Sequence, residues 1–133
     1  MSHQFSLTGA RAALAAALLL ASSWAQALSI SPYNEQALQQ LKQSGAAVAV
    51  FFHADWCPTC RKQAASLEVL KDDTALKDMT VLVANYDNEK ELRRALKVRS
   101  QSIMVVYSGE IEVTRVLGQT EPEAIKSAFT KAL

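Results

Sequence analysis

The stretch AAVAVFFHADWCPTC (residues 46–60) places two cysteines directly after a continuous apolar run. The run over residues 46–53 is rich in β-forming side chains and lacks polar alternation, which is typical of a central strand buried on both faces. From residue 58 onward, apolar side chains recur at helical spacing up to the charged cluster at residues 71–73. The sequence therefore predicts that the cysteine pair lies at the junction between a buried strand and a helix.

The spacing of Cys57 and Cys60 gives the two thiols different chemistry. Cys57 opens the predicted helix, where backbone N–H groups have no helical partner and the helix dipole stabilises a thiolate. Pro58 suits the first helical position because its missing N–H is not needed there, and Thr59 adds no ionisable group. Cys60 lies one turn further on the same face and deeper in the protein, where it can attack a mixed disulfide. We therefore expect Cys57 to be the nucleophile and Cys60 the resolving thiol.

Other interpretations of the cysteine pair exist. A disulfide that only braces the fold is a poor explanation, because so short a loop gains less than the about 3 kcal/mol expected for a loop of roughly 15 residues. A Cu(I) or Zn site formed by Cys57, Cys60 and His53 stays open as an alternative, since thiolates suit both ions, although only three ligands are visible. A third possibility is a protein-interaction module with the same fold that catalyses no reaction.

Residues 1–27 have the features of a cleavable export signal. Arg11 precedes an unbroken Ala/Leu run at residues 12–21, and Ala25-Gln26-Ala27 has the small-x-small pattern of a cleavage site. The run of about ten residues is shorter than the roughly 20 that a spanning helix needs. We therefore predict a soluble mature chain over residues 28–133 with no membrane span, exported to the periplasm or a similar compartment where disulfides persist.

Length points to one domain, and charge says little about partners. The 133 residues, 50% of them apolar, suffice for a single domain with its own core, and no repeat or linker divides residues 28–133. That segment has 13 basic and 13 acidic residues without a basic stripe, so charge favours neither nucleic acid nor an anionic surface. We expect a monomer that binds no nucleic acid.

The remaining elements complete an α/β pattern. Besides residues 46–53, strands are predicted at residues 28–31, 80–86, 102–107 and 110–116, the last two as a hairpin turning at Ser108-Gly109. A first helix is expected with Ser31 as N-cap, and a last helix with a capping box at residues 120–123; a short helix falls at residues 88–96. The order β-α-β-α-β-α-β-β-α implies a mixed sheet with helices on both faces.

The segment FFHADWCPTC (residues 51–60) resembles the active-site stretch of the thioredoxin family, and the order of elements resembles that family over essentially all of residues 28–133. The resemblance implies a thioredoxin fold and a thiol:disulfide oxidoreductase. With an export signal, it implies a protein that exchanges disulfides with cysteines of exported proteins and is recharged by an upstream redox protein. The redox group of this chain would then be its own Cys57–Cys60 pair, with no other cofactor. Since no histidine lies between the cysteines, a reductant is the expected direction.

The chain departs from the family at the loop that faces the cysteines. The family usually has a cis-proline there, where this sequence has Ser102. A non-proline cis bond costs about 2.5–4 kcal/mol, so we expect a trans peptide and an altered loop. The resemblance makes Gln101, Ser102 and Ile103 candidates for substrate contact. The Ser102 hydroxyl can hydrogen-bond a thiolate, or it is simply a polar surface-loop group, which is the simpler expectation.

Two further departures concern proton transfer. The buried aspartate of reducing thioredoxins is replaced by Phe51, and the matching lysine is missing at residues 82–84. His53, the one histidine of residues 28–133, can serve as a base or stabilise a thiolate, or it packs at the strand end.

The remaining candidates surround the cysteines. Trp56 is expected to shield Cys57 and, with Pro58 and Thr59, to contact substrate. No role is expected for Asp55.

Overall fold

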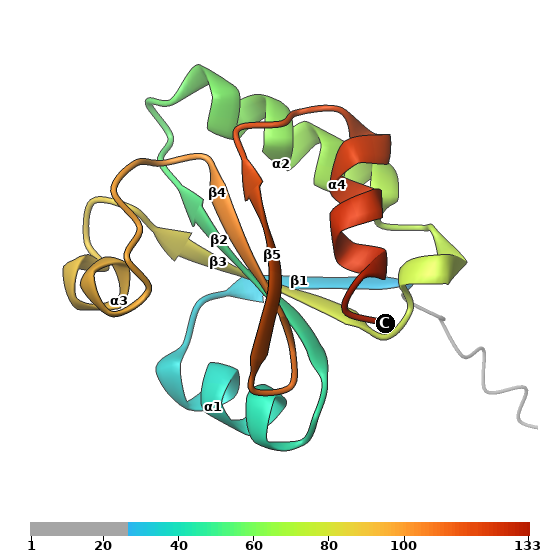
Figure 1. Cartoon of the computed structure of the whole chain (residues 1–133). Helices are drawn as coiled ribbons and strands as arrows, with labels where there is room; N and C mark the ends of the chain where they lie inside the picture. Colours follow the sequence, from blue (N-terminus) through green and yellow to red (C-terminus); the bar gives the residue numbers. More distant parts are fainter. Residues whose placement is uncertain (1–26) are drawn as a thin grey trace, which may run out of the picture.

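The computed structural model describes residues 27–133 (Figure 1). The predicted export signal therefore lies outside the described residues except for Ala27. The element order is β-α-β-α-β-α-β-β-α, as the sequence predicts, and one 3-10 turn, η1 (Thr74–Leu76), is present in addition.

One mixed sheet of five strands forms the centre of the structure. Its spatial order is β1-β3-β2-β4-β5, in which β1, β3 and β2 run parallel while β4 and β5 are antiparallel to their neighbours. The strands are β1 (Leu28–Pro32), β2 (Ala47–His53), β3 (Met79–Asn85), β4 (Ile103–Ser108) and β5 (Ile111–Leu117). The prediction of a mixed sheet is confirmed.

Four helices cover the two faces of this sheet. Helices α2 (Pro58–Leu70) and α4 (Pro122–Thr130) pack on one face, and α1 (Glu35–Gln43) and α3 (Lys90–Ala95) lie on the other (Figure 1). Successive β2 side chains alternate between the faces: Phe51 belongs to the α2/α4 core and Phe52 to the α1/α3 core. The unbroken apolar run in the sequence is thus the consequence of a central strand covered on both sides.

Two predicted helix starts are wrong. Ser31 does not cap α1, because Ser31 and Pro32 pair with β3 as part of the edge strand β1. Asn34 is the N-cap instead, and its Oδ1 accepts a hydrogen bond from the Ala37 N–H at 2.9 Å. The capping box predicted for α4 is absent as well, since Glu121 is the N-cap and caps with no side-chain hydrogen bond.

Candidate active site

The cysteine pair lies where β2 ends and α2 begins, as predicted. Cys57 is the N-cap of α2 in an extended conformation, and Pro58 occupies the first turn. The Cys60 N–H donates a hydrogen bond to Cys57 Sγ at 3.1 Å. One of the orphan N–H groups at the helix start is thereby aimed at the sulfur, and it stabilises negative charge there.

Both cysteines are free thiols and both are buried. Cys57 is 2% exposed and Cys60 is fully covered. Cys60 Sγ also lies 3.9 Å from the Phe52 carbonyl oxygen, a weak hydrogen bond into the end of β2. The second thiol therefore sits deeper than the first, as the spacing predicts.

Ser102 bridges the two sulfurs. Its Oγ lies 3.1 Å from Cys57 Sγ and 3.1 Å from Cys60 Sγ, and the residue is 6% exposed. The simpler expectation of a polar serine on the surface is therefore wrong. No peptide bond in residues 27–133 is cis, so the expected trans peptide in this loop is confirmed.

The backbone of Ser102 is held in an unusual conformation. Its φ of 66° lies in the left-handed region, which costs a non-glycine residue about 1–3 kcal/mol unless the surroundings fix it. Here they do: the Ser102 N–H donates to the Phe52 carbonyl at 3.0 Å, and the Ser102 carbonyl accepts from the Gly118 N–H at 3.0 Å and from Gln63 Nε2 at 3.1 Å. These bonds aim the hydroxyl at the thiols.

The two thiols differ in acidity. Burial opposes ionisation of Cys57, yet hydrogen bonds from the Cys60 side chain, the Ser102 hydroxyl and the Cys60 N–H outweigh it and lower its pKa. For Cys60, burial and the hydrogen bond with Cys57 raise the pKa above its ordinary value. Cys57 is therefore the more acidic thiol of the pair.

His53 faces away from this hydrogen-bond network. Its Nε2 lies 3.0 Å from Asp55 Oδ1, and its ring meets Phe51 edge-on with ring centres 5.3 Å apart. Its Nδ1 is buried without a partner beside a cavity of about 140 Å³ that Phe51 and Ala64 also line. Within residues 27–133 no hydrogen bond joins His53 to either sulfur, so the geometry favours the packing alternative.

Asp55 has contacts that the sequence analysis did not assign. Besides the hydrogen bond of its side chain to His53, its backbone carbonyl accepts from Arg61 Nη1 at 2.8 Å. The residue therefore fixes the turn between β2 and α2.

Trp56 presents an exposed aromatic surface beside the cysteines. The residue is 58% exposed, and its Nε1–H donates to Asp87 Oδ2 at 2.8 Å. Asp87 was not predicted, because it follows β3 and is 31 positions away in the chain. A tryptophan anchored at one end and open to solvent on its ring suits contact with another protein.

The other predicted contact residues divide into two groups. Pro58 is exposed and Thr59 half-buried at the start of α2, next to Trp56. Gln101 helps to lower the pKa of Cys57, whereas Ile103 starts β4 and packs in the α1/α3 core. The structure thus brings Gln101 to the sulfur and directs Ile103 inward.

Gln63 is a residue of the site that the sequence analysis missed. It is fully buried, and its Nε2 donates to the carbonyls of Ser102 at 3.1 Å and Gln119 at 3.0 Å. Its position one turn after Cys60 on the buried face of α2 was the available signal.

The metal alternative finds little support in the geometry. Among residues 27–133, no group of three or more His, Cys, Asp or Glu side chains is arranged to hold a metal ion. The expected third ligand, His53, is hydrogen-bonded to Asp55 instead.

In the part of the chain that the structure describes, no helix has the length and apolar character to cross a membrane.

A mixed five-stranded sheet with a Cys-x-x-Cys pair at the start of α2 defines a thioredoxin fold with a disulfide-exchange site. Comparison with known proteins agrees. A family model described as Redoxin matches residues 21–131. Thioredoxin-2 of Saccharomyces cerevisiae is 32% identical over 82 residues, which are 62% of this chain and 76% of that protein.

Solved structures share the same arrangement. The crystal structure of Trxlp from Edwardsiella tarda EIB202 has a TM-score of 0.73 at 36% identity, covering 77% of this chain and 99% of that one. A thioredoxin mutant from Halobacterium salinarum has a TM-score of 0.66 at 23% identity, covering 79% and 90%, and shows the fold alone. The chain belongs to the redoxin family and is a thiol–disulfide oxidoreductase of the thioredoxin type.

Proposed function

We propose that this protein is an exported reductant that passes two electrons from Cys57 and Cys60 to disulfides of exported proteins. The observation that carries the direction is the set of groups around Cys57 Sγ. All the groups that lower its pKa are uncharged, namely the Cys60 thiol and N–H, the Ser102 hydroxyl and Gln101. A cationic neighbour would stabilise the thiolate more strongly and make the pair a stronger oxidant.

The first step uses the acidity of Cys57. Its thiolate attacks one sulfur of the substrate disulfide, the substrate S–S bond breaks, and a mixed disulfide forms with Cys57. The substrate sulfur that leaves takes a proton from water. Because only 2% of Cys57 is exposed, docking of the substrate has to uncover Sγ.

The second step needs a path for the proton of Cys60. Cys60 attacks Cys57 Sγ, the bond from Cys57 to the substrate sulfur breaks, the Cys57–Cys60 disulfide forms, and the reduced substrate is released. Phe51 stands where the family has a buried acid, but the Ser102 hydroxyl contacts Cys60 Sγ. We assign Ser102 to accept the Cys60 proton while it donates its own hydrogen to the departing substrate sulfur.

Export and recharging complete the proposal. Residues 1–27 have the charge, apolar run and cleavage pattern of an export signal. A reductant in an oxidising compartment consumes its thiols with each turnover, so an upstream redox protein has to reduce the disulfide again. Mass determination of the protein from the exported fraction tests this point, with a mature chain starting at Leu28 as the expected result.

The reduction potential tests the direction. The metal-free mature protein, residues 28–133, is equilibrated in thiol/disulfide buffers of set potential. Its free thiols are then alkylated, and the fraction of reduced protein is determined by mass spectrometry. A potential near about −270 mV supports a reductant, and one near about −120 mV contradicts it in favour of an oxidant. A Cys60→Ser variant is the control and shows no intramolecular two-electron transition. Absence of a reversible transition in the wild type would overturn the redox proposal and make Cu(I) titration the next experiment.

A further inference from the structure

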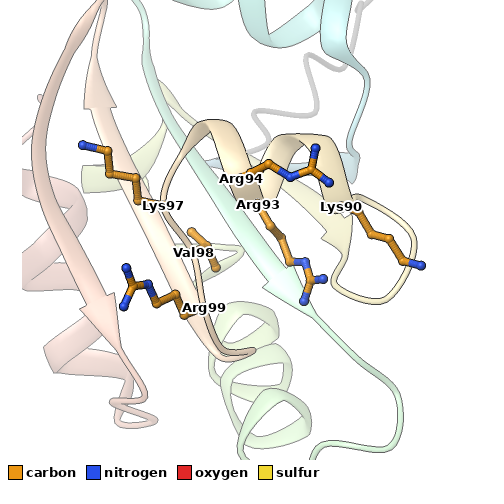
Figure 2. A pocket seen from close by; sticks show the side chains of 6 residues that line it. All are labelled: Lys90, Arg93, Arg94, Lys97, Val98 and Arg99. Atoms are coloured by element: carbon orange, nitrogen blue, oxygen red, sulfur yellow. The ribbon is translucent and has the colours of Figure 1, made fainter.

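Five basic side chains gather around α3 and the segment that follows it. Together with Val98 they line a pocket of about 500 Å³, and Figure 2 shows their side chains. Three project from α3 and two from the chain leading to β4. We call this group the α3 basic patch: Lys90, Arg93, Arg94, Lys97 and Arg99.

Little of this charge is neutralised locally. Within residues 27–133, Arg94 is the one member of the patch in an ion pair, with Glu91 at 3.0 Å, and both side chains are largely exposed. Residues 88–99 contain five of the 13 basic residues of the chain after residue 27 but only two of its 13 acidic ones. The overall charge balance therefore conceals a local positive surface, which attracts acidic groups.

The guanidinium of Arg93 is held in a fixed position. Its guanidinium lies over the Tyr86 ring at 4.0 Å from the centroid, and its Nε is buried with no hydrogen-bond partner. A stacked guanidinium has lost much of its conformational freedom, and its planar group of donors matches a carboxylate. The fixed plane of the guanidinium therefore suits an incoming acidic group, while the unpaired Nε is covered by protein.

The patch is physically joined to the active site. The Tyr86 N–H donates to the His53 carbonyl at 2.8 Å, and the Tyr86 hydroxyl donates to the Arg99 carbonyl at 3.0 Å. Arg99 lies three positions before Ser102, and the next residue after Tyr86, Asp87, anchors Trp56. A polypeptide bound at Cys57 and Trp56 is therefore next to this positive surface.

We propose that the α3 basic patch binds an acidic segment of the substrate polypeptide that flanks its disulfide. The proposal rests on the proposed function and adds a substrate class to it. A polypeptide fits better than a nucleic acid, because nucleic-acid sites interleave cations with open aromatic faces for stacking. Here Arg93 covers Tyr86, and Val98, the remaining lining residue, is buried.

Binding is tested first without redox chemistry, so that this proposal and the proposed function can fail separately. Cysteine-free fluorescent peptides, one rich in Glu and one with Gln at the same positions, are titrated with the reduced protein by anisotropy. The Glu peptide should bind about tenfold more tightly at about 0.05 M salt, and the difference should vanish near about 0.5 M. Equal binding of the two peptides, or tighter binding of a single-stranded oligonucleotide of equal charge, overturns the proposal.

A pair of charge-reversal variants locates the site. Lys97→Glu/Arg99→Glu alters two exposed members of the patch, while Lys77→Glu/Lys131→Glu makes the same charge change at exposed positions outside it. The first variant should lose the preference for the Glu peptide, and the second should keep most of it.

The same variants are then compared in reduction of a disulfide peptide with Glu or Gln flanks. The patch variant should lower kcat/KM about tenfold for the Glu-flanked peptide alone. An equal loss in both double variants contradicts a site at α3. Failure to reduce any peptide, with the binding preference intact, would contradict the proposed function and leave this patch supported.

Discussion

The hydroxyl oxygen of Ser102 lies 3.1 Å from the sulfur of Cys57, across 45 positions of the sequence. It is equally close to Cys60, so one hydroxyl can donate to the Cys57 thiolate while it accepts from the Cys60 thiol. This arrangement links the protonation states of the two cysteines. Burial raises the pKa of both cysteines and the Ser102 hydroxyl lowers both, whereas the hydrogen bond between the thiols lowers the pKa of Cys57 and raises that of Cys60.

Removing the hydroxyl should make Cys57 less acidic. In Ser102→Ala the thiolate loses a donor, and a hydrogen bond to a charged group contributes about 1.5–3 kcal/mol. The pKa of Cys57 should therefore rise, and its alkylation by iodoacetamide at neutral pH should slow about tenfold. The rate is measured against pH, since a shifted profile identifies a change in thiolate fraction.

Two controls separate this effect from backbone strain. Ser102→Gly also removes the hydroxyl, but glycine adopts a positive φ without strain. This variant should therefore show the same pH shift as Ser102→Ala with higher thermal stability. Ser100→Ala, an exposed position in the same segment, should leave the profile unchanged. An unshifted profile in both Ser102 variants would show that the hydroxyl does not stabilise the thiolate.

Gln63 should support both stability and acidity. Gln63→Leu leaves the buried carbonyl of Ser102 and the partly exposed carbonyl of Gln119 without this donor, although it also removes a buried Gln63 oxygen that has no partner. The free energy of unfolding should fall by about 1–3 kcal/mol, measured by urea unfolding of the reduced protein. The pKa of Cys57 should also rise as Ser102 loosens. Gln39→Leu on the exposed face of α1 is the matched control, and equal stability of the two variants would contradict this account.

The Trp56–Asp87 hydrogen bond should matter for substrate binding and not for thiol acidity. In Asp87→Ala the exposed indole loses its anchor, so KM for a protein disulfide should rise severalfold while the pH profile of alkylation stays the same. Asp78→Ala removes a different exposed carboxylate and should change neither quantity. A raised Cys57 pKa with unchanged KM would show that Asp87 acts on the thiol instead.

The sequence was sufficient where local pattern decides structure. The apolar run before the cysteines fixed β2 as a central strand, and Pro58 marked the start of α2. The helix starts at Ser31 and Thr120 were predicted wrongly, since pairing of β1 with β3 overrode a favourable capping sequence in the first case. Local propensity is weak evidence where a residue can gain more from tertiary contacts.

The hydrogen-bond network of the site could not be predicted in the same way. Ser102 reaches the sulfurs only because its backbone adopts a positive φ and is held from β2, α2 and the end of β5. No pattern of residue types predicts that conformation for a serine. The α3 basic patch was missed for a different reason: its members lie close together in the sequence, but the balance of 13 basic and 13 acidic residues over residues 28–133 conceals them.

The contact between Lys126 and Asp73 should govern stability in acid. Lys126 Nζ lies 2.7 Å from Asp73 Oδ2 and joins α4 to the turn before η1. The hydrogen bond from Lys126, followed by that from the Ala75 N–H, lowers the pKa of Asp73 in the folded protein. The unfolded chain therefore binds more protons between the two pKa values of Asp73. The stabilisation is complete above the unfolded value of about 4 and is lost as pH falls through the folded value.

Lys126→Met should remove most of this acid dependence. The melting temperature of the variant should fall less steeply below about pH 4 than that of the wild type, while the two differ most near neutral pH. Lys131→Met, an exposed lysine at the end of the same helix, should follow the wild-type curve. Parallel curves for wild type and Lys126→Met over the acid range would show that Asp73 titrates alike in the folded and unfolded states, and that this contact stabilises α4 by packing alone.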